Sequence, residues 1–333
     1  MARMRICGLA VVTVWIGLSA AGPASADGLA RFEKSIKPQI PPGTLTYKSS
    51  KGLGDDGFEL DDVVITPPPS DPAKGDKPQP INVKAITVEH LDFDAIEKQQ
   101  PPLFAKVKLD GITAAASNAG GFDLKQMAGI DNVSADFGVD YKLDPDKKTF
   151  TLKRLELNLS GLGKLETSFV LEGVSADIAA KPDAAMNDAS LKTADLTYDD
   201  HSLLAKAIPI AAAMQGSDPK ALTDMAITVL DGARAGQSAA AQKAIDSLVA
   251  YIEDYQKPKG PLKITLAPPS KVSNADLSAA KSADDVVKLL GIQVVYAGTR
   301  SSTPSAAPDA GATGPGSTDV PAKDEDEDSG KKK

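Results

Sequence analysis

Apolar and polar residues alternate at every second position over much of the chain up to about Tyr198, and this pattern restricts the fold most. The clearest case covers residues 133–143. Its apolar members are Val133, Ala135, Phe137, Val139, Tyr141 and Leu143, and its intervening members are Ser134, Asp136, Gly138, Asp140 and Lys142. Because side chains of a strand point alternately to opposite faces, the pattern predicts a strand with one buried and one solvated face.

Short turns join this strand to further strands. Residues 144–147 form a predicted turn into a strand over residues 149–159, and residues 160–163 form another turn into a strand over residues 164–174. Connections this short predict an antiparallel meander. Residues 103–109 alternate in the same way and predict a further half-buried strand.

A second spacing, apolar-x-x-apolar-x-apolar, recurs in the same part of the chain. It is found at Leu60, Val63 and Ile65; at Val83, Ile86 and Val88; at Leu152, Leu155 and Leu157; and, more weakly, at Leu191, Ala194 and Leu196. An extra residue in a strand is typical of a β-bulge, which bends the strand and increases its twist. The repetition therefore predicts a curved sheet. The alternative is coincidence in a chain rich in Leu and Val.

Helical signals take over after Tyr198. An Ala-rich segment over residues 201–215 contains Pro209, which predicts a kink or a break. A helix is predicted from Pro219 to Gly232, with its apolar face at Leu222, Met225, Ala226 and Val229.

Shorter elements are predicted on either side of these helices. Residues 241–255 predict a third helix, and residues 282–290 a fourth that begins with the capping box Ser282/Asp285. Strands are predicted at residues 262–266 and 292–296. A short helix at residues 27–36, capped by Asp27 and stopped by Pro38, is predicted at the start of the mature chain.

The two ends of the chain are not expected to join the fold. Residues 1–26 have the positive start, apolar run and small-residue cleavage site of a secretory signal, with an uncleaved anchor as the alternative. Residues 301–333 form a Ser/Pro/Ala/Asp/Lys tail with too few apolar residues to order itself. The domain prediction is therefore a signal at 1–26, a mainly antiparallel β region at 27–198, a mainly helical region with two short strands at 199–300, and a disordered tail at 301–333.

Composition excludes several classes of function. Cys7 lies in the signal, so the mature chain has no disulfide, no thiol chemistry and no cluster of His and Cys that could hold zinc. Cleavage takes the net charge from −8 to −10 by removing Arg3 and Arg5. An acidic chain with few arginines is not expected to bind nucleic acid. No segment of the mature chain is long and apolar enough to predict a transmembrane span.

Two local motifs resemble functional sites, and the structural interpretation is favoured for both. Residues 52–57 match G-x-G-x-x-G, but a strand and not a helix is predicted after them, so they indicate a hairpin loop. Residues 199–202, Asp-Asp-His-Ser, contain the residue types of a hydrolase triad. Four consecutive residues cannot form that geometry by themselves, and Asp199 and Asp200 instead predict a helix N-cap. The pairs Asp92/Asp94 and Asp144/Asp146 do not continue as calcium-binding loops.

Three stretches together resemble a group of uncharacterised exported proteins of Gram-negative bacteria. They are the bulged strand at 83–93, the passage at 194–204, and the run at 261–269 that precedes residues 289–292. The resemblance implies a periplasmic or secreted protein and supplies no catalytic residue.

The sequence therefore predicts an α+β fold, with a curved, bulged antiparallel sheet followed by a mainly helical segment packed against it. The function predicted is a non-catalytic binding or scaffold protein of the cell envelope. Its expected partner is an apolar or lipid-like ligand on the concave face of the sheet, or another envelope protein; the oligomeric state is open. A hydrolase with a site assembled from loops is the alternative. No catalytic, cofactor-binding or metal-binding residue and no cofactor is predicted.

Overall fold

The computed structural model describes residues 27–68, 79–115, 131–175 and 189–301. The predicted signal at 1–26 and the predicted tail, apart from Ser301, lie outside these residues. The described residues belong to one compact unit.

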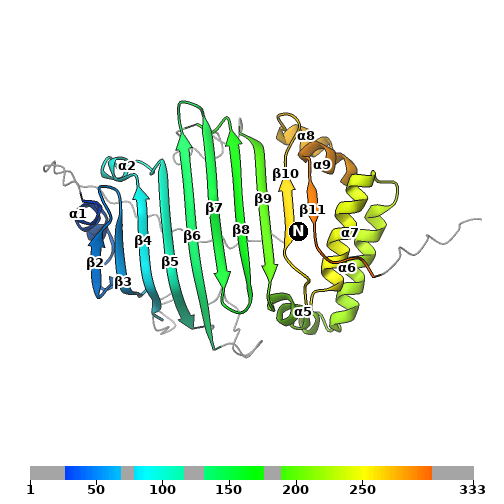
Figure 1. Ribbon diagram of the computed structural model, residues 1–333, viewed down its shortest axis with the longest axis horizontal. Coiled ribbons are helices and arrows are strands. Elements are labelled where there is room, and N and C mark those ends of the chain that lie inside the picture. Colours follow the sequence, from blue (N-terminus) through cyan, green and yellow to red (C-terminus); the bar gives the residue numbers. More distant parts are fainter. Residues whose placement is uncertain (1–26, 69–78, 116–130, 176–188, 302–333) are drawn as a thin grey trace, which may run out of the picture. The chain divides into compact units, whose positions relative to one another are not determined.

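A single antiparallel sheet dominates this unit (Figure 1). Its strands are β1 (Leu45–Thr46), β2 (Ser49–Gly52), β3 (Phe58–Ile65), β4 (Ile81–Leu91), β5 (Phe104–Ala115), β6 (Asn132–Asp144), β7 (Thr149–Leu159), β8 (Gly163–Glu172), β9 (Ser190–Asp200), β10 (Leu262–Leu266) and β11 (Gln293–Val295). From β3 to β11 each strand pairs with the next strand in sequence, while β1 and β2 both pair with β3. The predicted meander of β6, β7 and β8 is confirmed.

Helices lie at both ends of this sheet (Figure 1). They are α1 (Gly28–Arg31), the π-helix η1 (Phe32–Ile36), the 3₁₀-helix η2 (Lys37–Gln39), α2 (Phe93–Glu97), α5 (Leu203–Met214), α6 (Pro219–Arg234), α7 (Ala239–Glu253), α8 (Asn274–Ala279) and α9 (Ala283–Leu290). Helices α1, η1 and η2 precede the first strand, α2 lies between β4 and β5, and the helical segment from α5 to α9 follows β9. The predicted α+β class is confirmed. None of the helices in the described residues is long and apolar enough to cross a bilayer.

Bulges occur at two of the four predicted positions. The pairing register shifts beside Lys153 in β7 and beside Lys192 in β9, within the spacings that predicted them. In β3 and β4 no shift falls between the predicted residues, because two residues separate the apolar positions on both strands: Leu60 pairs with Ile86 and Val63 pairs with Val83. Equal irregularities on facing strands leave the register unchanged. Asp62 takes up the irregularity in β3 with a left-handed backbone, φ 49°.

Two predicted helix ends need correction. Pro38 does not stop the first helix, because the chain tightens into η2 and Pro38 lies within that turn. Of the kink or break predicted at Pro209, the break is absent, because helix α5 continues across that residue. Helix α6 passes through Gly232 and ends at Arg234, since an isolated glycine weakens a helix without terminating it.

Two buried clusters hold the helices on the sheet. The first lies at the β3–β4 end, where Phe32 of η1 stacks on Phe58 with 4.5 Å between ring centroids, and Phe93 of α2 packs beside them. The second lies at the β10–β11 end, where Tyr251 of α7 packs with Leu262, Val294 and Tyr296. Close backbone contact fixes the first cluster further, because a Cβ at Gly28 would lie 2.4 Å from the amide nitrogen of Gly57.

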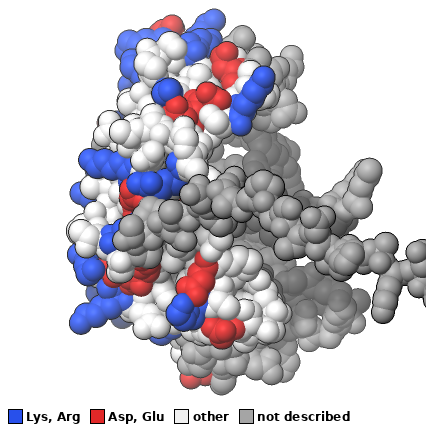
Figure 2. Space-filling view, turned by 90° about the vertical axis from the view of Figure 1, so that its right-hand side faces the viewer, with Lys and Arg blue, Asp and Glu red and all other residues white. Residues whose placement is uncertain are grey.

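Helix α6 faces solvent where the sequence predicts contact with the core. Met225 and Val229 lie on its predicted apolar face, yet they are 55% and 67% exposed. Helix α7 occupies the place against the sheet, and α6 packs on α7 instead. Figure 2, which faces this end of the molecule, shows uncharged residues over much of the surface between the charged side chains.

Candidate functional site

Continuous ladders of apolar side chains cross one face of the sheet. Directly paired residues of neighbouring strands lie on the same face, so the pairings define each ladder. One ladder consists of Leu60, Ile86, Leu109, Phe137, Leu157, Leu165, Tyr198 and Leu262. The next consists of Val88, Val107, Val139, Leu155, Thr167, Leu196, Ile264 and Val294. The alternation that predicted β6 thus extends across eight strands.

Only the ends of these ladders belong to the two buried clusters. Leu60, Val88 and their neighbours pack under η1 and α2, while Leu262 and Val294 pack under α7. The central members on β6–β8, such as Phe137, Val139 and Leu157, belong to neither cluster and are half-buried. We call this central region, formed by Phe137, Val139, Leu155, Leu157, Leu165 and Thr167, the apolar track.

The opposite face of the same strands carries charge. Lys164 on β8 pairs with Glu166 at 2.9 Å and with Glu156 on β7 at 3.3 Å. Lys153 pairs with Asp140, the neighbour of Val139, at 3.7 Å. The ion pairs show that this face of the sheet is in contact with solvent. The apolar track lies on the opposite face, which is therefore the face that favours contact with an apolar molecule.

A polar cluster adjoins the apolar track where β9 ends. Leu196, Tyr198 and Asp200 lie on the apolar face, and Asp200 is 5% exposed. Its Oδ1 accepts hydrogen bonds from the Tyr198 hydroxyl at 2.7 Å and from the Leu204 backbone N–H at 3.1 Å. Its Oδ2 is buried and has no hydrogen-bond partner among the described residues.

Three tyrosines pack together at this end of the sheet. The ring of Tyr251 meets Tyr198 and Tyr296 edge-on, at 6.3 and 5.0 Å between centroids. The Tyr296 hydroxyl donates to Asp254 and accepts from the Lys259 backbone N–H. The Tyr251 hydroxyl, in contrast, is buried with no partner among the described residues. Burial raises its pKa, and the Asp200 charge raises that pKa further, so the hydroxyl keeps its proton at neutral pH.

The Asp-Asp-His-Ser motif does not form a triad. The Ser202 hydroxyl donates to the Gly161 carbonyl at 2.7 Å, and the His201 ring lies 3.5 Å from Asp199 in an exposed position. The predicted N-cap needs correction, because Ser202 is the N-cap residue of α5. Asp200 lies two residues before Ser202, and its side chain accepts a hydrogen bond from the Leu204 backbone N–H in the first turn of the helix.

The other motifs have structural roles. Residues 52–57 connect β2 to β3 as the predicted hairpin loop, with a strand after the glycines. Asp92 caps α2, and Asp144 accepts from the Lys147 backbone N–H in the turn after β6. In the four described ranges, no group of three or more His, Cys, Asp and Glu side chains lies close enough to hold a metal ion.

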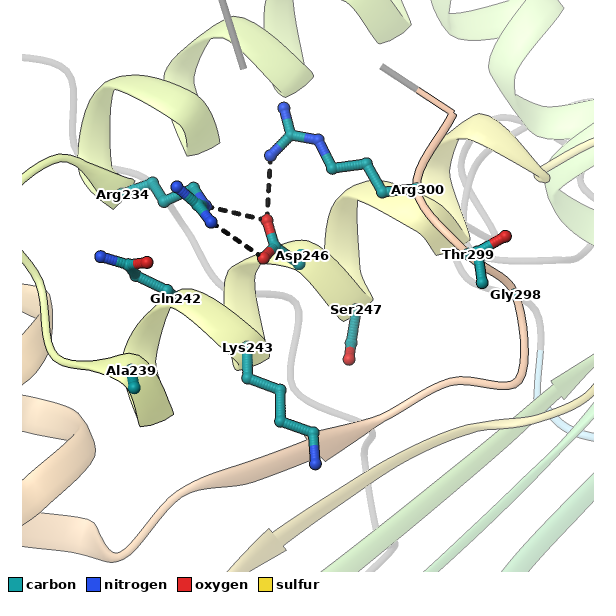
Figure 3. A pocket seen from close by; sticks show the side chains of 9 residues that line it. All are labelled: Arg234, Ala239, Gln242, Lys243, Asp246, Ser247, Gly298, Thr299 and Arg300. Carbon is teal, nitrogen blue, oxygen red and sulfur yellow. Dashed lines mark hydrogen bonds and ion pairs between the residues drawn. The ribbon is translucent and has the colours of Figure 1, made fainter. Parts of the chain in front are cut away.

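A second concave region, of about 350 Å³, lies between α7 and the segment after β11 (Figure 3). Arg234 donates to Asp246 at 2.9 and 3.2 Å, and Arg300 donates to the same carboxylate at 3.0 Å. Burial alone would raise the pKa of Asp246, but the two guanidinium groups lower it below its usual value. Figure 3 shows Lys243 directed away from both arginines. Arg300 also pairs with Asp231 of α6, so two carboxylates balance two guanidinium groups and the network fastens Arg300 to α6 and α7.

Comparison with known proteins identifies a family match over part of the chain. Residues 156–296 match a family model described as "Uncharacterized protein". This range covers the last four residues of β7, all of β8–β11 and the helices between them, so it includes Tyr198, Asp200 and Tyr251. No curated protein matches the chain.

Sequence reasoning found the apolar alternation and missed the polar cluster. Asp200 and Tyr251 are 51 residues apart in the sequence. They come close only because α7, which carries Tyr251, packs on the sheet at β9–β11. The signal that could have found Asp200 is its place in the alternation of β9, where a carboxylate follows Leu196 and Tyr198 on the apolar face.

Proposed function

We propose that this protein is a non-catalytic binding protein that holds a lipid-like molecule on the apolar track. The observation that supports the proposal is the pair of apolar ladders, which continue from one buried cluster to the other while their central members stay half-buried. Large partly exposed apolar patches mark binding sites more often than ordinary surface.

The dimensions of the apolar face suit an acyl chain. Strands are spaced ~4.8 Å apart, so the apolar track spans roughly 10 Å from β6 to β8, and the ladders run for roughly 19 Å from β5 to β9, where Val107, Leu109 and Tyr198 pack against the two buried clusters. One leaflet of the hydrocarbon core of a bilayer is about 15 Å thick. A chain lying across the strands would contact Phe137, Val139 and Leu157 and leave the charged face in water.

The hydrolase alternative has less support in the described residues. A nucleophile needs a base within hydrogen-bond reach, and Ser202 is bonded to a backbone carbonyl instead. The buried Asp200 accepts hydrogen bonds from the Tyr198 hydroxyl and the Leu204 backbone N–H, and neither donor is a nucleophile that it could activate at this site.

A titration with a fluorescent fatty-acyl probe tests the proposed function. Wild-type protein is expected to bind the probe saturably, with an emission shift toward the blue, and unlabelled phospholipid is expected to displace it. Emission that rises without saturation, or that lipid does not reverse, would contradict the proposal.

We also propose that the protein works outside the cytoplasm, in the periplasm or the surrounding envelope. The proposal rests on the signal-like composition of residues 1–26. N-terminal sequencing of the protein from the periplasmic fraction is expected to begin at Asp27. A chain that keeps Met1 in the membrane fraction would show that the segment is an anchor.

A further inference from the structure

Two buried polar atoms beside the apolar track lack a hydrogen-bond partner in the described chain. They are Oδ2 of Asp200 and the hydroxyl oxygen of Tyr251, each on a side chain that is 5% exposed. Leaving such a group unsatisfied costs about 1–3 kcal/mol, so native proteins seldom retain one without a reason. The two groups lie at the same end of the sheet, because Tyr198 donates to Asp200 and its ring meets that of Tyr251.

The polar atoms next to these two do have hydrogen-bond partners. Oδ1 of the same carboxylate has two donors, Tyr198 and the Leu204 N–H. The Tyr296 hydroxyl has both an acceptor and a donor. A carboxylate oxygen can only accept, whereas a tyrosine hydroxyl can donate or accept. The chemical group that fits both atoms therefore carries a hydrogen-bond donor.

The position of these atoms links them to the proposed ligand. Tyr198 belongs to the ladder that contains Leu165 and Phe137, and Asp200 follows it on the same face of β9. A chain lying along that ladder therefore reaches the polar cluster at β9. We propose, resting on the proposed function, that the end of the ligand at β9 is a donor group, a hydroxyl or an ammonium, received by Asp200 and Tyr251.

This assignment predicts a preference among single-chain lipids. A hydroxyl satisfies Oδ2 of Asp200, whereas its methyl ether leaves that atom unpaired. An ammonium adds a charge-assisted hydrogen bond, and a carboxylate is repelled. Displacement of the fluorescent probe is therefore expected to be about 10-fold more effective with hexadecanol than with hexadecyl methyl ether; this ratio corresponds to ~1.4 kcal/mol, which is within the range for a buried acceptor left without its hydrogen bond. Hexadecylammonium is expected to be the strongest competitor and hexadecanoate the weakest.

Tyr251→Phe is the variant that separates ligand binding from folding. The ring stays in the core and only an unpartnered hydroxyl is removed, so the melting temperature of the ligand-free protein is expected to stay the same or rise. The preference for hexadecanol over its ether is expected to fall several-fold. Asp200→Asn is expected to abolish the preference for the ammonium, although it also disturbs Tyr198 and Leu204.

Each outcome of this experiment decides a different claim. Equal displacement by the alcohol and the ether, with normal probe binding, would overturn the donor assignment and leave the proposed function standing. A lower melting temperature for Tyr251→Phe, with no change in preference, would show that a structural water satisfies the hydroxyl and would also overturn the assignment. Failure of every lipid to displace the probe would overturn both proposals.

Discussion

Replacement of Phe93 by alanine is expected to lower the free energy of unfolding by about 3–5 kcal/mol. Phe93 is 0% exposed, its ring lies 6.3 Å from that of Phe58, and the Arg31 guanidinium lies 5.0 Å above its centroid. The substitution leaves a cavity between α2, η1 and the sheet, and close-packed backbone at Gly28 and Gly57 limits its collapse. Urea denaturation followed by circular dichroism measures the loss.

Phe137→Ala provides the matched control. Phe137 lies on the same face of the sheet but on the apolar track, where it is half-buried. Because the stability gained from an apolar side chain scales with the area it buries, the loss is expected to be less than half of that at Phe93. Equal losses at the two positions would mean that the track is packed like the core, which would contradict its role as an open binding face.

Val139→Asp is expected to reduce affinity for the fatty-acyl probe by at least 100-fold. Val139 lies in the middle of the apolar track, between Val107 on β5 and Leu155 on β7. A bound chain would strip water from the new carboxylate, at a cost of about 3 kcal/mol or more, which corresponds to roughly 100-fold in affinity. In the ligand-free protein the half-buried site keeps some water, so the expected loss of stability is smaller, about 1–2 kcal/mol.

Asp140→Asn is the control one residue away. Asp140 points to the charged face and contacts Lys153 at the surface, with 59% of the Lys153 side chain and 22% of the Asp140 side chain exposed. Surface ion pairs contribute little, so both stability and probe affinity are expected to change by less than about 1 kcal/mol. Similar effects of the two variants on probe binding would refute the assignment of the ligand to one face of the sheet.

Local patterns predicted the sheet well because strand periodicity is a local property. A residue and its second neighbour share a face, so the alternation in β6 and the turns after it suffice to predict the meander and its faces. Helix α2 was missed, since its five residues are too few to show a helical period and they directly follow the strand pattern of β4.

Packing partners were harder to predict than elements. The apolar stripe of α6 was found correctly as a pattern, but the sequence does not say which of two amphipathic helices takes the place against the sheet. Helix α7 does so through Ala244 and Tyr251, and this leaves Met225 and Val229 of α6 in solvent. The polar cluster at Asp200 depends on the same long-range packing: the alternation of β9 places Asp200 on the apolar face, but it does not specify that Tyr251 of α7 packs beside it.

Photolabelling with a diazirine-bearing fatty acid tests the apolar track most directly. Adducts are expected on one face of three adjacent strands, at Phe137, Val139, Leu155, Leu157 and Leu165, and they are expected to be lost in Val139→Asp. Adducts on the alternate residues of the same strands, or mainly on the exposed face of α6 at Met225 and Val229, would contradict it.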